Sequence, residues 1–422
     1  MKEGILTSIL DWNPWFDGEF PKKLLGFKRD IDIEQYLQTN EIKILEGSRR
    51  VGKSTLMYQV MYKVYKENKN ILYLNFDDEI LRQYSLSEVF ETFLEYKEVD
   101  YLFVDEIQNC TNWVHYIRKL YDLKKLKQIW ITGSNSNLIK QEYASLLTGR
   151  NITLQIFSLN FNEFLRFKNL KYNMKLLSTD KKIQLYKLFK EYYQFGAFPE
   201  VALREVNKKE LLINYFEDFL FKDIVSRYNV NSIKLKELSL YLSSNSSKYI
   251  SYRNLAKVLE LNYNSIVDYI SYYLEVYLFD MLYKYDISVK KQISNDRKVY
   301  SLDTGISNSV SFKFSEDRGR ILENIVFIEL KRRGLEVYYH KEKKECDFII
   351  KGGLNIDQAI QVTTSLEDID TRKRELAGLV DACRTYNLKR GLILTQDEEY
   401  ELEEEGVSIQ VLPLWKWLLL EQ

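Results

Sequence analysis

The sequence predicts an α/β chain, in which a parallel sheet covered by helices is followed by a mostly helical segment and a second, smaller α/β unit. Short apolar runs rich in β-branched residues alternate with helical stretches, which predicts parallel strands buried on both faces. These runs are residues 42–47, 71–76, 101–106, 128–134 and 152–157. Only 16 glycines and 4 prolines occur among 422 residues, which favours long helices over turn-rich all-β folds.

Composition excludes several classes of protein. Lys plus Arg equals Asp plus Glu at 61 each, which excludes a protein held on nucleic acid by bulk positive charge but leaves local basic patches open. Three cysteines without C-x-x-C spacing (Cys110, Cys346 and Cys383) and two histidines (His115 and His340) argue against disulfide frameworks and zinc ribbons. We therefore expect a reducing, cytoplasmic location. No apolar run approaches the length of a membrane span.

The strongest motif is GSRRVGKST, which follows the first apolar run and precedes a helical stretch. It satisfies G-x-x-x-x-G-K-[ST], the pattern of a phosphate-binding loop. Glycines let the backbone wrap closely around phosphates, and the N–H groups and the following helix N-terminus supply positive potential. Lys53 is expected to neutralise the β- and γ-phosphates of ATP, and Ser54 to ligate Mg²⁺. The predicted nucleotide-binding residues are Gly47, Ser48, Arg49, Arg50, Val51, Gly52, Lys53, Ser54 and Thr55.

Polar residues end two later strands of the predicted sheet. Asp105 and Glu106 follow the run YLFV, and we expect Asp105 to hold Mg²⁺ and Glu106 to polarise the attacking water. The run QIWITG ends in Ser134, Asn135 and Ser136, one of which would contact the γ-phosphate or orient the water. Ser134 lies nearest the strand end, but the residues leave the choice open.

Three arginines are further candidates. Arg150, in the string LLTGRN, is a catalytic candidate that would act as an arginine finger either in cis or on a neighbouring chain. A surface arginine is the competing interpretation. Arg49 and Arg50 lie inside the loop itself, where each would either screen phosphate charge or project into solvent.

The chain resembles an archaeal AAA-type P-loop ATPase family in which a helical region, a winged helix and a PD-(D/E)xK nuclease-like domain follow the ATPase core. The strings that carry the resemblance are WNPWF, EGSRRVGKSTLMYQV, FVDEIQN, ITGSNS, LLTGR, FGAFPEV, EDRGRILENIVFIELKRRG, ECDFIIK and QVTTS. Together they span nearly the whole chain. The resemblance implies ATP binding and hydrolysis, without defining a cellular task.

The fold class that follows is α/β: a P-loop, additional-strand (AAA+-like) parallel sheet domain, then a helical and winged-helix region, then a restriction-endonuclease-like α/β domain. The expected domains are a lead-in segment at 1–40 with one short helix near 32–38, the ATPase core at 41–160, a helical lid-like region at 161–230 broken at 194–200, the winged helix at 231–305 and the nuclease-like domain at 306–422.

Residues 251–279 read as helix, turn and longer helix, followed by two strands and a turn that suit a wing. The wing carries Lys290, Lys291, Arg297 and Lys298, which would contact DNA phosphates. Acidic Asp268 on the second helix opposes DNA, so a structural or protein-binding winged helix stays the alternative. The many tyrosines of this helix fall at helical spacing, which favours core or interface positions over base stacking.

In the nuclease-like tail, Glu323 on a helix and Asp347 at a strand start match acids of the resembled fold. An active member also needs an acid and a lysine, as (D/E)-x-K, on the next strand. This sequence has Gln361-Val362-Thr363 there. A glutamine would ligate Mg²⁺ weakly and Thr363 cannot replace an ammonium, so we expect no nuclease activity. Whether Lys351 on the preceding strand takes the lysine's role is left open.

The predicted function is therefore a Mg²⁺-dependent ATPase that couples nucleotide state to its C-terminal domains and acts on DNA. The alternative is a nucleotide-gated DNA- or protein-binding regulator with slow hydrolysis, and a less favoured one is an ATP-dependent nuclease. Because sites of this kind are often completed by a neighbour's arginine, a homo-oligomer is a further expectation.

Overall fold

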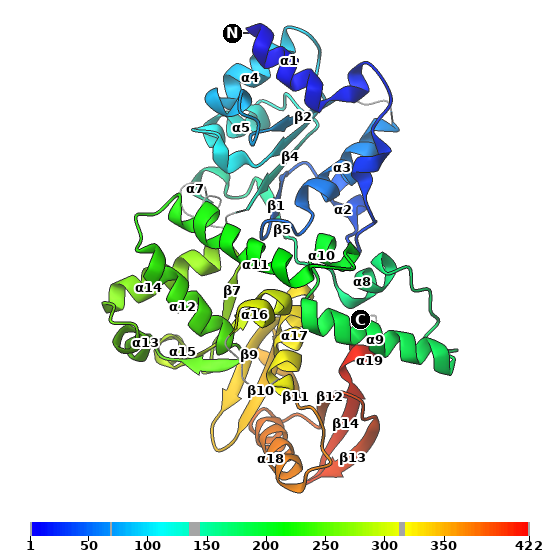
Figure 1. The fold of residues 1–422 in the computed structure, drawn as a ribbon, viewed down its shortest axis with the longest axis vertical. Helices are drawn as coiled ribbons and strands as arrows, with labels where there is room; N and C mark the ends of the chain where they lie inside the picture. The colour runs from blue at the N-terminus through cyan, green and yellow to red at the C-terminus, as the bar shows by residue number, and fades with distance from the viewer. Residues whose placement is uncertain (1, 68–69, 135–143, 312–316, 421–422) are drawn as a thin grey trace. The chain divides into compact units, whose positions relative to one another are not determined.

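A computed structural model of the chain describes residues 2–67, 70–134, 144–311 and 317–420 (Figure 1). The chain forms two compact units. The first comprises residues 1–157 with 275–277, and the second comprises residues 158–274 and 278–422. Within the described ranges, no helix combines the length and apolar character needed to cross a membrane.

The first unit is built on a five-stranded parallel sheet with the order β2-β3-β4-β1-β5. Its strands are β1 (Ile42–Glu46), β2 (Ile71–Asn75), β3 (Tyr101–Asp105), β4 (Gln128–Gly133) and β5 (Asn151–Gln155). All of them match the predicted apolar runs, and their pairing is parallel throughout. The predicted fold class is confirmed for this unit. Strand β1 lies between β4 and β5, and the carboxyl ends of β1 and β3 lie at the same edge of the sheet.

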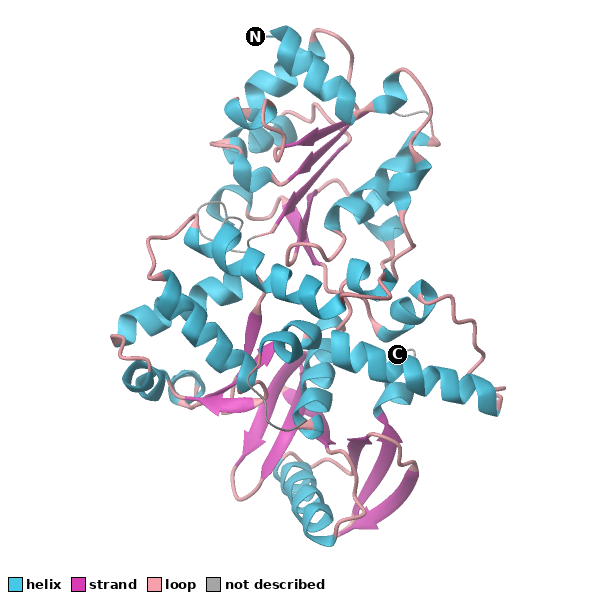
Figure 2. Cartoon of the chain, viewed as in Figure 1, coloured by secondary structure: helices cyan, strands magenta, loops and turns pink. Residues whose placement is uncertain are grey.

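Helices cover both faces of this sheet (Figure 2). Alternate strand residues such as Ile44 and Val104 pack with α1, α4 and α5, while Tyr73 faces Tyr58 of α3 with ring centroids 5.0 Å apart. The helical segments of the unit are α1 (Lys2–Trp12), η1 (Pro14–Phe16), η2 (Lys22–Leu25), α2 (Ile33–Leu37), α3 (Lys53–Tyr65), η3 (Leu81–Gln83), α4 (Leu86–Leu94), η4 (Ile107–Asn109), α5 (Trp113–Asp122) and α7 (Ala144–Leu147).

The lead-in segment contains more structure than predicted. The short helix expected near 32–38 is α2, but α1 also forms at the beginning of the chain. Ile5 and Ile9, four residues apart, lie on one helical face and are buried in the core of the first unit. This apolar pair was the sequence signal for the missed helix.

The second unit begins with helices, as predicted: α8 (Phe161–Phe167), α9 (Thr179–Phe195), α10 (Pro199–Leu203), α11 (Lys208–Asp218), the π-helix η5 (Phe219–Val225) and α12 (Ser232–Ser244). The predicted break at 194–200 is real, because α9 ends at Phe195 and Gly196 takes φ +68°. A Cβ atom at Gly196 would lie 1.9 Å from Oδ1 of Asp303, so only glycine fits this turn.

A three-stranded antiparallel sheet follows, with β8 in its centre and the order β6-β8-β7. Its elements are β6 (Lys248–Ile250), α13 (Tyr252–Val258), α14 (Tyr263–Glu275), β7 (Phe279–Leu282), α15 (Val289–Ser294) and β8 (Arg297–Ser301), and α16 (Thr304–Val310) comes next. The expected helix pair and strand pair are present, but α15 replaces the simple wing turn. Tyr269, Tyr273 and Tyr277 are buried, which confirms the core interpretation of these tyrosines.

The chain ends in a separate sheet domain with the strand order β13-β14-β12-β11-β10-β9. Strands β11, β12 and β14 are parallel, and the remaining pairs are antiparallel. Helix α18 packs on the sheet so closely that a Cβ atom at Gly378 would lie 2.0 Å from the Glu345 carbonyl oxygen. The elements are α17 (Arg318–Arg332), β9 (Glu336–Lys341), β10 (Glu345–Gly352), β11 (Asn355–Val362), α18 (Ile369–Thr385), β12 (Arg390–Thr395), β13 (Tyr400–Glu404), β14 (Val407–Pro413) and α19 (Leu414–Trp417).

Candidate nucleotide site

The loop between β1 and α3 has the backbone that its glycines predict. Gly47 takes φ +149° and Gly52 takes φ +98°, and Arg50 also has a positive φ of 68°. A Cβ atom at Gly47 would lie 2.2 Å from the Ile156 carbonyl oxygen, so the loop needs glycine there. Gly52 caps α3 without any side-chain hydrogen bond, which leaves the first N–H groups of the helix facing the loop.

Lys53 is folded over the loop and is almost completely buried. Its Nζ donates to the carbonyl oxygens of Gly47 at 3.0 Å and Ser48 at 2.9 Å. The ammonium therefore lies against the loop that would surround a phosphate group.

Arg29, a buried residue that the sequence analysis did not single out, holds the phosphate loop through hydrogen bonds to the backbone. Nη1 of Arg29 donates to the Val51 carbonyl oxygen at 2.8 Å, and Nη2 donates to the Phe157 carbonyl oxygen at 2.9 Å. Only 6% of Arg29 is exposed. The guanidinium ties the loop to the residues that follow β5, and nothing in the local sequence around Arg29 indicates this role.

Asp105 lies at the end of β3, buried beside the phosphate loop. Its Oδ2 accepts a hydrogen bond from the Tyr73 hydroxyl at 2.8 Å, and Oδ1 accepts one from Thr132. Burial and the neighbouring Glu106 raise the pKa of Asp105, while hydrogen bonds from Thr132 and Ser54 act in the opposite direction. The fold thus brings together Ser54 and Asp105, the residues expected to hold Mg²⁺.

Glu106 follows on a left-handed turn with φ +51°, and its N–H donates to Thr132 Oγ1 at 3.0 Å. The Gln108 side-chain amide donates both to the Glu106 carboxylate and to Ser134 Oγ at 3.2 Å. Gln108 therefore links two predicted catalytic residues, although it was not itself predicted. Its position in the string DEIQN, two residues after the glutamate, was the available signal. Asn135 and Ser136, the other candidates at this strand end, lie outside the described residues.

The remaining loop residues differ in exposure. Val51 is buried, so it contributes through its backbone, and Arg50 is exposed. Arg49 is partly exposed and acts on Asp77, whose pKa is raised by burial and by Glu106 but lowered by the Arg49 charge. Thr55 lies in the first turn of α3, and a Cβ atom at Gly26 would be 3.0 Å from its methyl group. Arg49 is therefore the loop arginine near the carboxylates of the site.

The position of Arg150 contradicts its predicted role as an arginine finger within its own chain. Its Nε donates to Asp122 Oδ1 at 2.8 Å, and its carbonyl oxygen accepts from the N–H of Ile42 at the beginning of β1. Since the loop follows the opposite end of β1, Arg150 lies at the far edge of the parallel sheet. An arginine finger in cis is therefore wrong for Arg150, and a role on a neighbouring chain stays a prediction.

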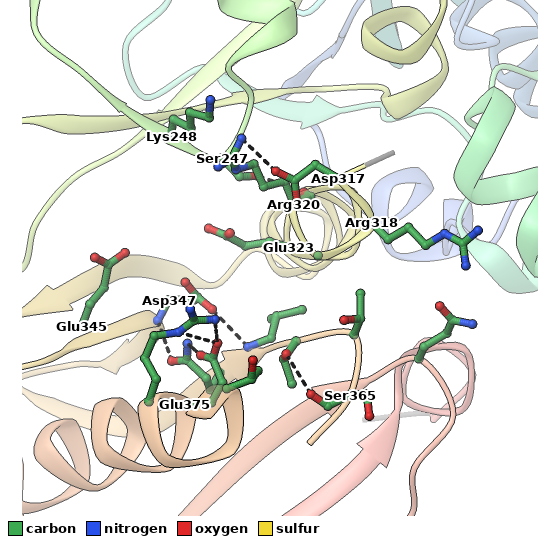
Figure 3. Close-up of a pocket in the computed structure, with 18 of the residues that line it drawn as sticks. Ser247, Lys248, Asp317, Arg318, Arg320, Glu323, Glu345, Asp347, Ser365 and Glu375 are labelled. Atoms are coloured by element: carbon green, nitrogen blue, oxygen red, sulfur yellow. Dashed lines mark hydrogen bonds and ion pairs between the residues drawn. The ribbon is translucent and has the colours of Figure 1, made fainter. Parts of the chain in front are cut away.

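In the second unit, a pocket of about 1150 Å³ brings together most of the residues singled out in the C-terminal domain (Figure 3). Glu323 comes from α17, Asp347 from β10 and Gln361 from β11. Lys351, left open as a replacement lysine, instead pairs with Glu336 at 2.9 Å and does not line the pocket. Thr363 lines the pocket, and its hydroxyl donates to the Ser365 carbonyl oxygen at 3.3 Å.

The predicted wing cations have different surroundings. Lys290 and Lys291 are exposed on α15, and Lys291 lies 4.0 Å from Asp286. Arg297 is partly buried and stacks over the Tyr283 ring at 4.6 Å. Lys298 is 2% exposed and lines the pocket among carboxylates, so the expectation that it contacts DNA phosphates is wrong. Alternation along β8 explains the correction, because Lys298 points to the opposite side of the strand from Arg297.

Two family models match parts of the chain. Residues 39–165 match the family model described as AAA domain, and residues 186–317 match one described as a domain of unknown function. An uncharacterised protein of Methanocaldococcus jannaschii is 36% identical over 95% of this chain and 93% of its own length. The chain belongs to the same family as that archaeal protein. An uncharacterised protein of Haemophilus influenzae is 31% identical over 93% of this chain and 99% of its own.

Solved structures with distant similarity were also found. AMPPCP-bound DnaA from Aquifex aeolicus is 17% identical with a TM-score of 0.28, covering 56% of this chain and 84% of that one. A mutant of RuvB from Thermotoga maritima is 14% identical with a TM-score of 0.30, covering 57% and 81%. Cdc6p from Pyrobaculum aerophilum is 11% identical with a TM-score of 0.28, covering 73% and 98%.

Proposed function

We propose that this protein is a Mg²⁺-dependent ATPase that couples its nucleotide state to the rest of the chain. The observation that carries the proposal is the meeting of the glycine loop, Lys53, the Ser54–Asp105 pair and Glu106 at one edge of the parallel sheet. That edge is where ligands bind in open α/β sheets.

The residues present fit ATP and Mg²⁺. The loop has glycine at Gly47, where a Cβ atom would lie 2.2 Å from the Ile156 carbonyl oxygen, and the Lys53 ammonium adds positive charge beside the loop. Ser54 and Asp105 supply a hydroxyl and a carboxylate, which are ligands that Mg²⁺ prefers, and the bound ion would neutralise phosphate charge.

Glu106 is proposed as the group that accepts the proton of the attacking water. Its carboxylate lies next to Asp105 in the chain and is linked through Gln108 to Ser134. Ser134 and Gln108 would orient the water together with the terminal phosphate. A neighbouring chain would supply the arginine, with Arg150 as the candidate.

Two variants test this proposal. Lys53→Ala should abolish binding of ATP, while Glu106→Gln should keep binding and lower the turnover number by about a hundredfold or more, because the proton acceptor is lost. Glu98→Gln, at an exposed position of the same unit, is the matched control and should hydrolyse ATP at the parent rate. An unchanged turnover number in Glu106→Gln would remove the proposed base.

A second candidate function is a nucleotide-gated regulator that binds DNA or protein. The exposed Lys290 and Lys291 on α15, flanked by Ile287 at 93% and Val289 at 66% exposure, favour it. A salt-dependent electrophoretic shift of DNA, measured with and without an ATP analogue, tests the DNA form. The shift should weaken in Lys290→Glu and Lys291→Glu but not in Lys298→Met, and its absence in every nucleotide state would exclude DNA.

A further inference from the structure

In the pocket of the second unit, three acidic side chains surround the ammonium group of Lys298. Nζ of Lys298 lies 3.0 Å from Glu323 Oε1, 3.0 Å from Asp347 Oδ1 and 2.9 Å from Glu345 Oε1. The carboxylates come from α17 and β10, whereas the lysine comes from β8 of the three-stranded sheet. Figure 3 shows Glu323, Asp347 and Glu345 on these elements.

The three oxygens are spaced for an ammonium. Charge-assisted N–H···O bonds are about 2.7–2.9 Å long, whereas Mg²⁺–oxygen distances are about 2.1 Å and Ca²⁺–oxygen distances about 2.3–2.6 Å. Burial alone would lower the pKa of Lys298, but Glu323 and Asp347 raise it well above the ordinary value. The three carboxylates therefore favour the charged form of the lysine.

Several polar atoms next to these carboxylates make hydrogen bonds within the pocket. Oδ2 of Asp347 accepts from the Val362 N–H at 3.1 Å. Gln361 accepts from the Asp347 N–H at 3.2 Å through Oε1 and donates to Glu375 at 2.5 Å through Nε2. The Tyr300 hydroxyl donates to Glu323 at 2.6 Å. Gln361, where the resembled nuclease fold carries an acid, thus uses its amide to hold the pocket together.

The residues present do not fit the divalent ion that the nuclease resemblance implies. Among the described residues, no group of three or more His, Cys, Asp or Glu side chains is arranged to hold a metal ion. Gln361 is neutral, so it supplies no negative charge where the resembled fold carries an acid.

We propose that the Lys298 ammonium takes the place of a divalent cation between Glu323 and Asp347, so that this pocket binds no metal ion. The cation is a covalent part of the chain, carried into the C-terminal domain by the central strand of the preceding sheet. This inference does not depend on the proposed ATPase activity.

Titration with Mn²⁺ alone, without nucleotide, tests the proposal in the full-length chain, with free Mn²⁺ followed by electron paramagnetic resonance. Lys298→Met removes the charge but keeps an unbranched side chain, and it should bind one Mn²⁺ more per chain than the parent. Lys351→Met, which removes a lysine paired outside the pocket, should behave like the parent.

Adding Asp347→Asn to Lys298→Met should abolish the additional ion, which distinguishes the pocket from the phosphate-loop site of the first unit. Bound Mn²⁺ should also raise the unfolding temperature of Lys298→Met but not that of the double variant. A folded Lys298→Met chain that binds no additional Mn²⁺ would overturn the proposal.

If Lys298→Met does not fold, comparing Mn²⁺ binding by the parent and by Asp347→Asn still tests the proposal. With Lys298 in place, both should bind Mn²⁺ identically, because Asp347 is not a metal ligand. Mn²⁺ bound by the parent and lost in Asp347→Asn would show that the pocket takes a metal ion beside the lysine, and the inference would be wrong.

Discussion

The side-chain amide of Gln108 donates a hydrogen bond to the carboxylate of Glu106, two residues before it on the turn after β3. The same nitrogen also donates to Ser134 Oγ at the end of β4. One amide thus fixes the orientation of the proposed proton acceptor relative to the neighbouring strand.

Gln108→Ala is expected to lower the turnover number for ATP about tenfold and to change KM less than about twofold. The reason is that Gln108 is proposed to position Glu106 and the attacking water, which affects the chemical step more than the binding of ATP. Steady-state kinetics measure the two constants separately. Gln108→Asn keeps the amide on a shorter arm and should recover part of the loss, and a KM effect larger than the turnover effect would contradict the positioning role.

Thr132→Val is expected to destabilise the first unit by about 1–3 kcal/mol, the usual range for a buried polar group left without its partner. The Thr132 hydroxyl is fully buried, donates to Asp105 and accepts from the Glu106 N–H at 3.0 Å. Chemical denaturation measures the loss. Thr132→Ser keeps the hydroxyl and should remain close to the parent in stability, whereas equal losses of stability in both variants would point to the methyl group.

Gly47→Ala is expected to abolish ATP binding and to destabilise the first unit, because the new Cβ atom would lie 2.2 Å from the Ile156 carbonyl oxygen. The matched control is Gly4→Ala in α1, where a Cβ atom meets no atom within 4 Å. That control should stabilise the chain by up to about 1 kcal/mol, since alanine is the better helix former. Fluorescent nucleotide binding and thermal unfolding check both; normal binding by Gly47→Ala would contradict the loop geometry.

Asp303 is expected to make the stability of the second unit depend on pH. Its carboxylate accepts from the N–H groups of Ala197 and Gly305, each at 2.9 Å, but burial still raises its pKa from 3.8 to about 6. A rise of this size corresponds to roughly 3 kcal/mol against the charged form. The folded chain therefore takes up this proton at higher pH than the unfolded chain.

The raised pKa of Asp303 makes the folded chain more stable at low pH. Between about pH 6 and pH 4 the folded state holds more protons at Asp303, so this group increases the free energy of unfolding as the pH falls. Denaturation at several pH values should show that Asp303→Asn loses this contribution, while Asp268→Asn, at an exposed position of α14, keeps it. Identical pH profiles for the parent and Asp303→Asn would contradict the assignment.

Sequence reasoning located the features that are local in the chain. Each strand and the phosphate loop consist of residues that are contiguous in the sequence, so periodicity and motif spacing were enough to predict them. Arg29 reaches the Phe157 carbonyl oxygen across 128 residues, and Lys298 reaches Asp347 across 49. Such pairs arise from the packing of distant segments, and no local pattern specifies them. The wing was misread for a related reason, because alternation along β8 decides which of two adjacent cations faces the interior.

The central place of β8 has a practical consequence for work with fragments of this chain. A piece that ends at residue 305 would retain Lys298 without the carboxylates that hold it, and a piece that begins at 306 would bury Glu323 and Asp347 without a counter-charge. Each half would carry uncompensated buried charge, which is strongly destabilising. The two segments should therefore be expressed as one piece, even though sequence patterns divide them between two domains.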